Sequence, residues 1–366
     1  MKNIKNIVSV IVFSVFLITV SSVCLAKPDT QYSDAERREL AQFPKTSAET
    51  IATGEFSKGF ESYTTDQFPM RELMRKIKAA FSTVILGKAE NNGLFYMGGH
   101  ISKIDEQENE KMMDHAAARF TYLRDTYLKD NKIYFSIIPD KNMFIAEKNG
   151  YPSLDYKGFA HRMKSKVDFM EYVDIYDLLS ADDYYNTDTH WRQEKITDIA
   201  DRLLNVMGKG INGGSYNENT SDFPFRGVYS GQYALNIPAD TIKYLTNDTL
   251  NNAIVTYYDT GMPKVGDMYN MDKASSKDPY EMFLSGAMPL VTIEKSSGNQ
   301  ENHLILFRDS FGSSIAPLFL KGYDKITLID TRYVQSGLLG NLVDFSGADV
   351  LFLYSTSLLN SSLAIK

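Results

Sequence analysis

Two short stretches of the chain carry side chains suited to acyl chemistry. The sequence Thr187-Asp188-Thr189-His190-Trp191 places a carboxylate two residues before an imidazole, and Ser310 follows the apolar run 303–307. In an extended segment, residues i and i+2 lie on the same side, so Asp188 can fix the tautomer of His190 and support its charged form. A serine base needs this support. A serine at a strand end that precedes a helix can also gain N–H groups that stabilise the oxyanion of an ester under attack.

Each stretch also has a structural interpretation. Ser310 can be a helix N-cap, a common position for serine. Asp188 can likewise cap the following helix, with His190 as a polar surface residue. A metal site is a further alternative, but the five histidines are scattered and none forms a His-x-x-x-His pair. Trp191 can stack on a sugar ring or pack behind His190.

The apolar runs predict the elements that must position these residues. Five short runs of buried-strand type are separated by helix-length connections, at 132–138, 173–176, 303–307, 326–329 and 350–354. This spacing predicts a parallel, right-handed α/β sheet with function at the carboxyl ends of its strands. Amphipathic periodicity predicts helices at 107–129, 196–207 and 312–320, and two more between 57 and 81 around a break at 67–69. Residues 94–97 predict a short hairpin, and 208–302 a β-rich insertion.

Composition bounds the class of protein. The 366 residues are 43% hydrophobic and 23% charged, which is globular and excludes a disordered, collagen-like or disulfide-framework chain. The formal charge of −7 gives no reason to expect a nucleic-acid partner and permits a neutral, polyhydroxyl ligand. At this length either one large α/β domain with insertions or two domains is expected, and we favour the first.

The N-terminus predicts export. Lys2 and Lys5 precede an uncharged run at 7–26, so residues 1–26 are either a cleaved signal peptide or an N-terminal membrane anchor, followed by a domain at 27–366. Cys24 is the only cysteine, and its context is poor for lipidation. Cleavage at Ala26 would leave no cysteine for a disulfide, a thiolate metal site or a cysteine nucleophile.

The chain as a whole resembles a known family. Asp188-Thr189-His190-Trp191 with Ser310 far downstream is similar to the alginate O-acetyltransferase family (AlgJ/AlgX-like) and the related DHHW family, whose catalytic domains are SGNH-hydrolase-like. The order of the motifs, with Asp-x-His before the serine, is a trait of this family. The resemblance spans most of residues 27–366. Further stretches similar to the family lie at 36–44, 66–71, 92–95, 138–141, 225–230 and 329–333.

The resemblance implies an SGNH-hydrolase-like (flavodoxin-like) parallel sheet flanked by helices. It also implies Ser310 as nucleophile, His190 as general base and Asp188 as its orienting acid. Two departures matter. Thr189 stands where DHHW proteins have the first histidine of Asp-His-His-Trp, as in the alginate acetyltransferases, and Gly286-Ala287-Met288-Pro289 stands where many DHHW proteins have a Gly-Asn-His-Pro-like stretch. The candidates for oxyanion or substrate contacts, besides the Ser310 amide, are Gly286, Arg332, Tyr333 and Trp191.

The export signal then restricts the chemistry. An exported protein cannot reach cytosolic acetyl-CoA, no Walker-type phosphate loop is present, and no metal or other cofactor is expected. The resemblance implies a membrane-bound O-acyltransferase as acetyl supplier, a polysaccharide hydroxyl as acceptor and a glycan synthase complex as a further partner. The sequence therefore predicts a secreted or membrane-anchored exopolysaccharide O-acetyltransferase of the cell surface or biofilm, working through an acetyl-serine intermediate. A carbohydrate acetyl esterase and a catalytically idle polysaccharide-binding scaffold are the alternatives.

Overall fold

The computed structural model describes residues 2–105, 107–210, 214–259, 262–296 and 301–366. Its internal contacts group the chain into two compact units. The first comprises residues 1–92 and 230–237, and the second comprises residues 93–229 and 238–366.

The first unit is mostly helical. Its apolar first helix, α1 (Lys2–Ala26), is followed by a two-residue ladder of β1 (Tyr32–Ser33) and β2 (Arg38–Glu39). Then come α2 (Ala48–Ala52), α3 (Glu55–Asp66), α4 (Arg71–Ala80) and the π-helical turn η1 (Phe81–Ile85). The break between α3 and α4 falls at the Gln67-Phe68-Pro69 sequence, where it was predicted, because proline cannot donate an N–H within a helix. Within the described residues, one segment, Ile4–Cys24 of α1, is long and apolar enough to cross a membrane.

An eight-stranded sheet organises the second unit, in the order β10-β9-β11-β13-β12-β14-β5-β6. Its five parallel strands are β13 (Lys325–Ile329), β12 (His303–Arg308), β14 (Asp349–Ser355), β5 (Ile133–Ile138) and β6 (Glu171–Tyr172). Nearly every residue of the three central strands is buried, as expected for a parallel sheet covered on both faces.

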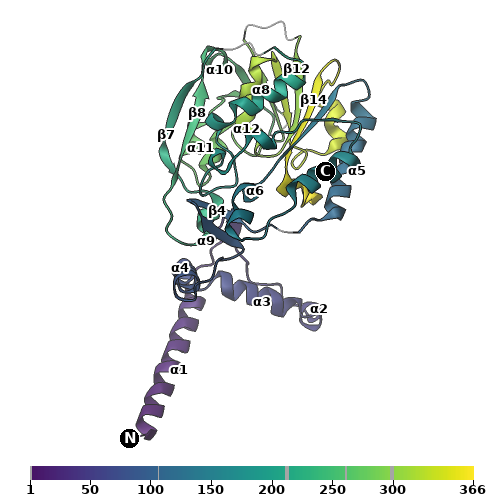
Figure 1. Cartoon of the computed structure of the whole chain (residues 1–366). Helices are drawn as coiled ribbons and strands as arrows, with labels where there is room; N and C mark the ends of the chain where they lie inside the picture. The colour runs from purple at the N-terminus through teal and green to yellow at the C-terminus, as the bar shows by residue number, and fades with distance from the viewer. Residues whose placement is uncertain (1, 106, 211–213, 260–261, 297–300) are drawn as a thin grey trace. The chain divides into compact units, whose positions relative to one another are not determined.

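Helices flank this sheet on both sides (Figure 1). Helix α5 (Glu110–Tyr127) lies on one side of β12 and β14, and α8 (Thr197–Val206) and α12 (Gly312–Ile315) lie on the other. Phe120 of α5 packs on the rings of Phe352 and Tyr354, with centroids 4.8 and 5.3 Å away. The α/β class and the helix-flanked sheet predicted from the sequence are confirmed, and the arrangement is consistent with an SGNH-hydrolase-like fold.

The segment 208–302 is rich in strands but is not set apart from the sheet. Strands β7 (Asn217–Phe225) and β8 (Asp240–Thr246) form a separate antiparallel pair. By contrast, β9 (Ile254–Tyr257), β10 (Lys264–Gly266) and β11 (Leu290–Glu294) extend the central sheet, because β11 pairs antiparallel with β13. This segment therefore completes one edge of the sheet.

One predicted strand is wrong in its position. Residues 173–176 were expected as a strand, whereas β6 covers Glu171–Tyr172, the Val173 amide still donates to the Phe135 carbonyl of β5 at 2.8 Å, and the chain then turns into η3 (Tyr176–Leu178). The Asp174 carboxylate accepts a hydrogen bond from the Tyr176 amide at 2.9 Å, which favours the turn over an extended strand.

The remaining elements are one helix of 11 residues and a set of shorter helices and strands. They are β3 (Leu94–Met97), β4 (His100–Lys103), α6 (Asn142–Ile145), η2 (Glu147–Asn149), α7 (Tyr156–Lys166), η4 (Ala181–Asp183), η5 (Gln193–Lys195), α9 (Val228–Tyr233), α10 (Asp248–Asn251), α11 (Met271–Ala274), η6 (Pro279–Met282), η7 (Ala316–Lys321), η8 (Ser336–Asn341), α13 (Thr356–Leu359) and η9 (Ser362–Ala364). Strands β3 and β4 form the predicted hairpin.

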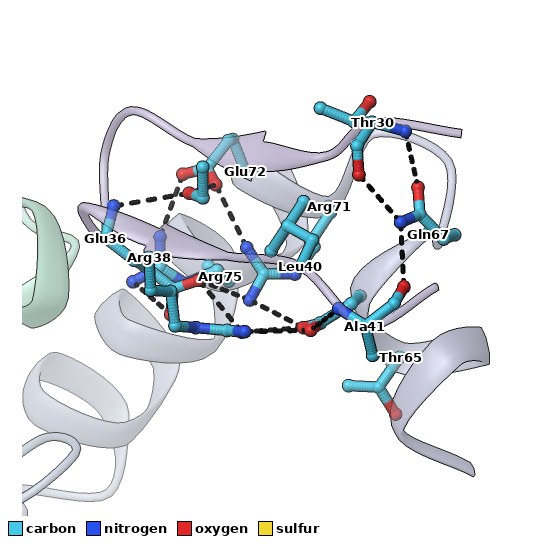
Figure 2. Close-up of polar contacts among 12 residues, drawn as sticks. Thr30, Glu36, Arg38, Leu40, Ala41, Thr65, Gln67, Arg71, Glu72 and Arg75 are labelled. Carbon is cyan, nitrogen blue, oxygen red and sulfur yellow. Dashed lines mark hydrogen bonds and ion pairs between the residues drawn. The ribbon is translucent and has the colours of Figure 1, made fainter. Parts of the chain in front are cut away.

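A network of ion pairs holds the first unit together. Figure 2 shows Arg38, Arg71 and Arg75 converging with Glu36 and Glu72. At its centre the buried Asp66 accepts two hydrogen bonds from Arg38, at 2.8 and 2.6 Å, and one from the Ala41 amide at 2.9 Å. These donors, led by Arg38, lower the pKa of Asp66 to about 2.

This network makes a prediction about acid stability. Because the pKa of Asp66 is lower in the folded state than the value of 3.8 expected when unfolded, its carboxylate stabilises the fold above pH 3.8. That stability is lost as the pH falls from 3.8 through about 2. Asp66→Asn should lower the local stability of the first unit by about 2 kcal/mol at pH 7 and have little effect near pH 2.

Hydrogen exchange of the α3 and α4 amides measures this effect. Glu61→Gln, an exposed change on α3, is the matched control and should leave exchange unchanged. The only tryptophan, Trp191, lies in the second unit, so its fluorescence should not respond to either substitution. An equal effect of Asp66→Asn at pH 7 and pH 2 would contradict the role given to the carboxylate.

Candidate active site

The candidate residues gather at the carboxyl edge of the parallel strands. Strand β5 ends before Pro139-Asp140-Lys141, β12 before Asp309-Ser310, and β13 before Asp330-Thr331-Arg332. Parallel strands bring these ends to one edge of the sheet, the edge that the sequence predicts for the site.

The turn after β12 presents Ser310. The buried carboxylate of Asp309 accepts hydrogen bonds from the Phe311 amide at 3.0 Å and from the Ser355 amide at 2.9 Å. These contacts tie the serine turn to the end of β14. Gly312 is required next, because a Cβ there would lie 2.5 Å from the Cβ of Arg308. Ser310 itself remains partly exposed.

Ser310, His190 and Asp188 form one continuous hydrogen-bonded line. The Nε2 atom of His190 lies 2.7 Å from Ser310 Oγ, and its Nδ1 atom lies 2.6 Å from Asp188 Oδ1. Because a carboxylate accepts, His190 donates from Nδ1 and its Nε2 is free to accept the serine proton. The structure thus brings together the three residues proposed from the sequence in the arrangement of a nucleophile, a base and an orienting acid.

The backbone around Asp188 fixes its carboxylate. Its Oδ1 accepts a hydrogen bond from the His190 amide at 3.1 Å, and its Oδ2 accepts one from the Val228 amide at 2.8 Å. Gly227 permits this approach, since a Cβ there would lie 2.3 Å from the Asp188 Cβ. The motif at 225–230, noted in the sequence only as part of the resemblance, therefore supports the acid.

Two buried charges hold the loop that carries Asp188. The Nζ atom of Lys141 donates to the carbonyls of Tyr185, Asn186 and Asp188 at 2.8, 3.1 and 2.7 Å. On the other side, the Asp240 carboxylate accepts from the Asn186 amide at 2.9 Å and from the Thr187 amide at 2.7 Å. Neither residue was identified as functional from the sequence, although Lys141 lies in a stretch that carries the resemblance.

Aromatic rings hold the imidazole of His190 in place. The ring of Tyr280 stacks on it with centroids 3.9 Å apart and planes 9° apart, and Phe311 lies 4.9 Å away. Tyr280 donates from its hydroxyl to Ser314 Oγ at 2.9 Å, so the ring cannot swing away without losing that bond. No sequence signal indicated Tyr280, because it lies in the β-rich segment, far along the chain from His190.

Trp191 packs behind the site and does not face a ligand. Its side chain is fully buried, and its Nε1 donates to the Phe311 carbonyl at 3.1 Å and to Ser314 Oγ at 2.9 Å. A buried indole cannot stack on a sugar, so the proposal of Trp191 as a substrate contact is corrected and the packing interpretation holds.

The other residues expected to contact the oxyanion or the substrate differ in the contacts that they already make. The Gly286 amide donates to the Phe283 carbonyl at 3.2 Å, which leaves it no N–H for an oxyanion. The Arg332 guanidinium makes a two-point contact with Asp330, at 2.9 and 2.7 Å. Tyr333 is half exposed beside it. Among the described residues, the Ser310 amide has no assigned acceptor and remains the candidate donor.

A buried arginine lies under the serine turn. The guanidinium of Arg308 is 3.5 Å from Asp330 and donates to the Gly286 and Met288 carbonyls at 3.4 Å. Burial lowers its pKa, while the Asp330 carboxylate opposes that change. Arg308 thus connects β12 to the loop before β11. Within the described ranges, no group of three His, Cys, Asp or Glu side chains is placed to hold a metal ion.

Comparisons with known proteins support the fold. No protein-family description matches the chain, and no curated protein matches it in sequence. A DHHW family protein from Eubacterium siraeum DSM 15702 aligns with a TM-score of 0.60 at 19% identity, over 75% of this chain and 95% of its own. PatB1 of Bacillus cereus, solved with a sulfonyl adduct, aligns with a TM-score of 0.56 at 17% identity, over 73% of this chain and 95% of its own.

A third structure is more distant. The O-acetyltransferase domain of Pseudomonas putida AlgJ aligns with a TM-score of 0.42 at 10% identity, over 73% of this chain and 92% of that one. This score is too low to demonstrate a common fold. The first two comparisons show that the chain shares the fold of the DHHW family protein, as the sequence resemblance implied, and of PatB1.

The geometry predicts selective covalent labelling of Ser310. A sulfonyl fluoride should form a bond between sulfur and Ser310 Oγ with loss of fluoride, because His190 can remove the hydroxyl proton. Peptide mass spectrometry should locate the adduct on Ser310, and His190→Gln should slow labelling by about 100-fold or more. Ser313→Ala, three residues away and buried, is the control and should label normally. Equal labelling of wild type and Ser310→Ala would exclude an activated Ser310.

The Lys141 contacts predict that the rate of Ser310 labelling falls at alkaline pH. Three carbonyls require three N–H groups, which only the ammonium form supplies, and burial lowers the pKa of Lys141 to about 8. Labelling of Ser310 should therefore decline as the pH rises through about 8, when the loop of Asp188 loses a donor. Lys141→Met should label slowly at pH 7 and lack this decline, with Trp191 fluorescence as the check on folding. An identical decline in that variant would assign the titration to another group.

Proposed function

We propose that this protein is an extracytoplasmic O-acetyltransferase that moves an acetyl group through Ser310 to a polysaccharide hydroxyl. The observation that carries the proposal is the line of hydrogen bonds from Ser310 through His190 to Asp188, at 2.7 and 2.6 Å. The shared fold with PatB1, a protein that has been solved with a sulfonyl adduct, supports it.

The first half of the reaction loads the serine. Ser310 Oγ attacks the carbonyl carbon of an acetyl donor while His190 Nε2 takes the hydroxyl proton, and the imidazolium is stabilised by Asp188. The Ser310 amide is available to donate to the oxyanion. When the tetrahedral intermediate collapses, the bond to the donor oxygen breaks, and His190 returns the proton to that oxygen. An acetyl-Ser310 ester remains.

The second half reverses these roles with a new alcohol. His190 takes a proton from the acceptor hydroxyl, whose oxygen attacks the acetyl carbon. The Ser310 oxygen leaves and regains its proton from His190. The product is an acetylated sugar if a saccharide enters, and acetate if water enters, so the acceptor alone distinguishes a transferase from an esterase.

The N-terminal helix supports the location of this chemistry. A 21-residue apolar segment within α1 is compatible with export as a cleaved signal or with retention as an anchor. On the outer side of a membrane, an acetyl group has to be delivered to the enzyme. A membrane-bound O-acyltransferase is the partner class that meets this need, and a glycan synthase complex would supply the nascent acceptor.

A small activated acetyl ester tests the proposal. Wild-type protein should release one equivalent of leaving group in a burst and then turn over slowly, because the acetyl-serine waits for an acceptor. Ser310→Ala should abolish the burst. His190→Ala should lower the rate by a comparable factor, and Asp188→Asn should retain more activity because it disturbs only orientation and charge support.

Acceptor dependence separates the candidate functions. Added oligosaccharide should accelerate turnover and yield acetylated sugar. Acetate release at a rate unchanged by saccharide would instead identify a carbohydrate esterase. Full activity in Ser310→Ala would contradict both the transferase and the esterase hypotheses, and would leave a polysaccharide-binding scaffold as the remaining function.

A further inference from the structure

An exposed apolar strip runs along α4 and η1 in the first unit. Its members share large apolar side chains that are 42–74% exposed: Leu73, Met74, Ile77, Phe81, Val84, Ile85 and Leu86. Seven such residues within fourteen positions form a continuous surface, and contiguous exposed apolar surface marks a site that contacts a protein or a membrane.

The opposite side of α4 explains why this strip faces outward. Arg71 and Arg75 are largely buried on that side, where they pair with Glu36, and Ala79 is fully buried beside them. The helix therefore turns its arginines inward and its apolar side chains outward, the reverse of a helix that packs on an apolar core. The ion pairs of Figure 2 fix this rotation.

Basic residues border the strip. At 100° per residue, Lys76 and Lys78 project on either side of Ile77, and both are exposed. Residues 73–89 contain Arg75, Lys76, Lys78 and Lys88 and no Asp or Glu. An apolar face edged by lysines is the pattern of a helix that lies in the interface of an anionic bilayer.

The same unit holds α1 close to this helix. Tyr63 Oη donates to Asp29 at 3.0 Å, and Gln67 exchanges two hydrogen bonds of 2.9 Å with the backbone of Thr30. Lys27 lines the same cavity as Met70 and Leu73. The chain that leaves α1 is therefore fastened to the end of α3, next to the start of α4. This point lies within a few residues of the end of the segment that is long enough to span a bilayer.

We propose that the strip of α4 and η1 lies in the lipid–water interface of an anionic membrane, beside the outer end of α1. In this arrangement Ile77, Phe81 and Val84 contact the acyl-chain boundary, and Lys76 and Lys78 contact phosphate groups. The first unit then acts as a membrane-binding platform and not only as a tether. This proposal does not depend on acetyl transfer.

A fluorescent probe at Val84 tests the proposal in the full chain. Cys24→Ser removes the only cysteine, and Val84→Cys labelled with an environment-sensitive dye then reports its surroundings. The labelled protein is added to vesicles of phosphatidylglycerol and phosphatidylcholine that contain no other protein. The emission of the dye should shift to the blue and be quenched by lipids whose acyl chains are brominated near the headgroup. The matched control, Lys157→Cys in the second unit, is exposed and should remain unquenched.

Substitutions within the strip and at its basic border give a second test of membrane contact. Ile77→Glu and Lys76→Glu, each with the Val84 probe, should lose most of the quenching, since both side chains are exposed. Lys78 is left unchanged because its ammonium donates to Asn92 Oδ1 at 2.6 Å. If the dye at Val84 keeps the emission it has in water when vesicles are added, the proposal is overturned in favour of a protein partner. A blue shift without lipid quenching that disappears on diluting the protein would overturn it in favour of a second copy of this chain.

Discussion

The site depends on one hydrogen bond, the one that His190 Nδ1 donates to Asp188 Oδ1 across 2.6 Å. It assigns the tautomer of the ring and thereby leaves Nε2 as an acceptor facing Ser310 Oγ. It also provides a fixed negative charge for the imidazolium that would form during attack. A serine hydroxyl without that partner is a weak nucleophile, so the chemistry open to this protein follows from how firmly Asp188 is held.

Most of the surrounding structure serves to hold it. Asp188 is fully buried, and a buried carboxylate is tolerated only when hydrogen bonds replace the lost water. The Val228 amide and Gly227 support it from one segment. Lys141 binds the Asp188 carbonyl, and Asp240 binds the Thr187 amide just before it. These supports come from segments far apart in sequence, so the site forms only when those segments fold together. Ser310 and His190 remain partly exposed, whereas Asp188 is buried.

Much of the fold could be predicted because the relevant signals are local. Continuous apolar runs mark β5, β12, β13 and β14, and the Asp-x-His spacing places two groups on one side of a short segment. The exceptions involve distant partners. The antiparallel pairing of β11 with β13 depends on where a long loop returns, and the strand expected at 173–176 gave way to a turn stabilised by Asp174.

The supporting residues of the site escaped prediction for the same reason. Lys141 is recognisable only by three carbonyls that belong to a different loop, and Tyr280 only by the imidazole on which it stacks. Trp191 was open to two interpretations because a tryptophan beside a histidine looks alike in sequence whether it faces solvent or the core. Burial decided between them.

The most direct test of the central claim is a search for the covalent intermediate. The protein should be mixed with an activated acetyl ester, quenched in acid within the first turnover and examined by intact-mass and peptide mass spectrometry. The account predicts a single added acetyl group on Ser310 that disappears when an oligosaccharide acceptor is supplied before the quench. An acetyl group on any other residue, or none in an enzyme that is turning over, would contradict it.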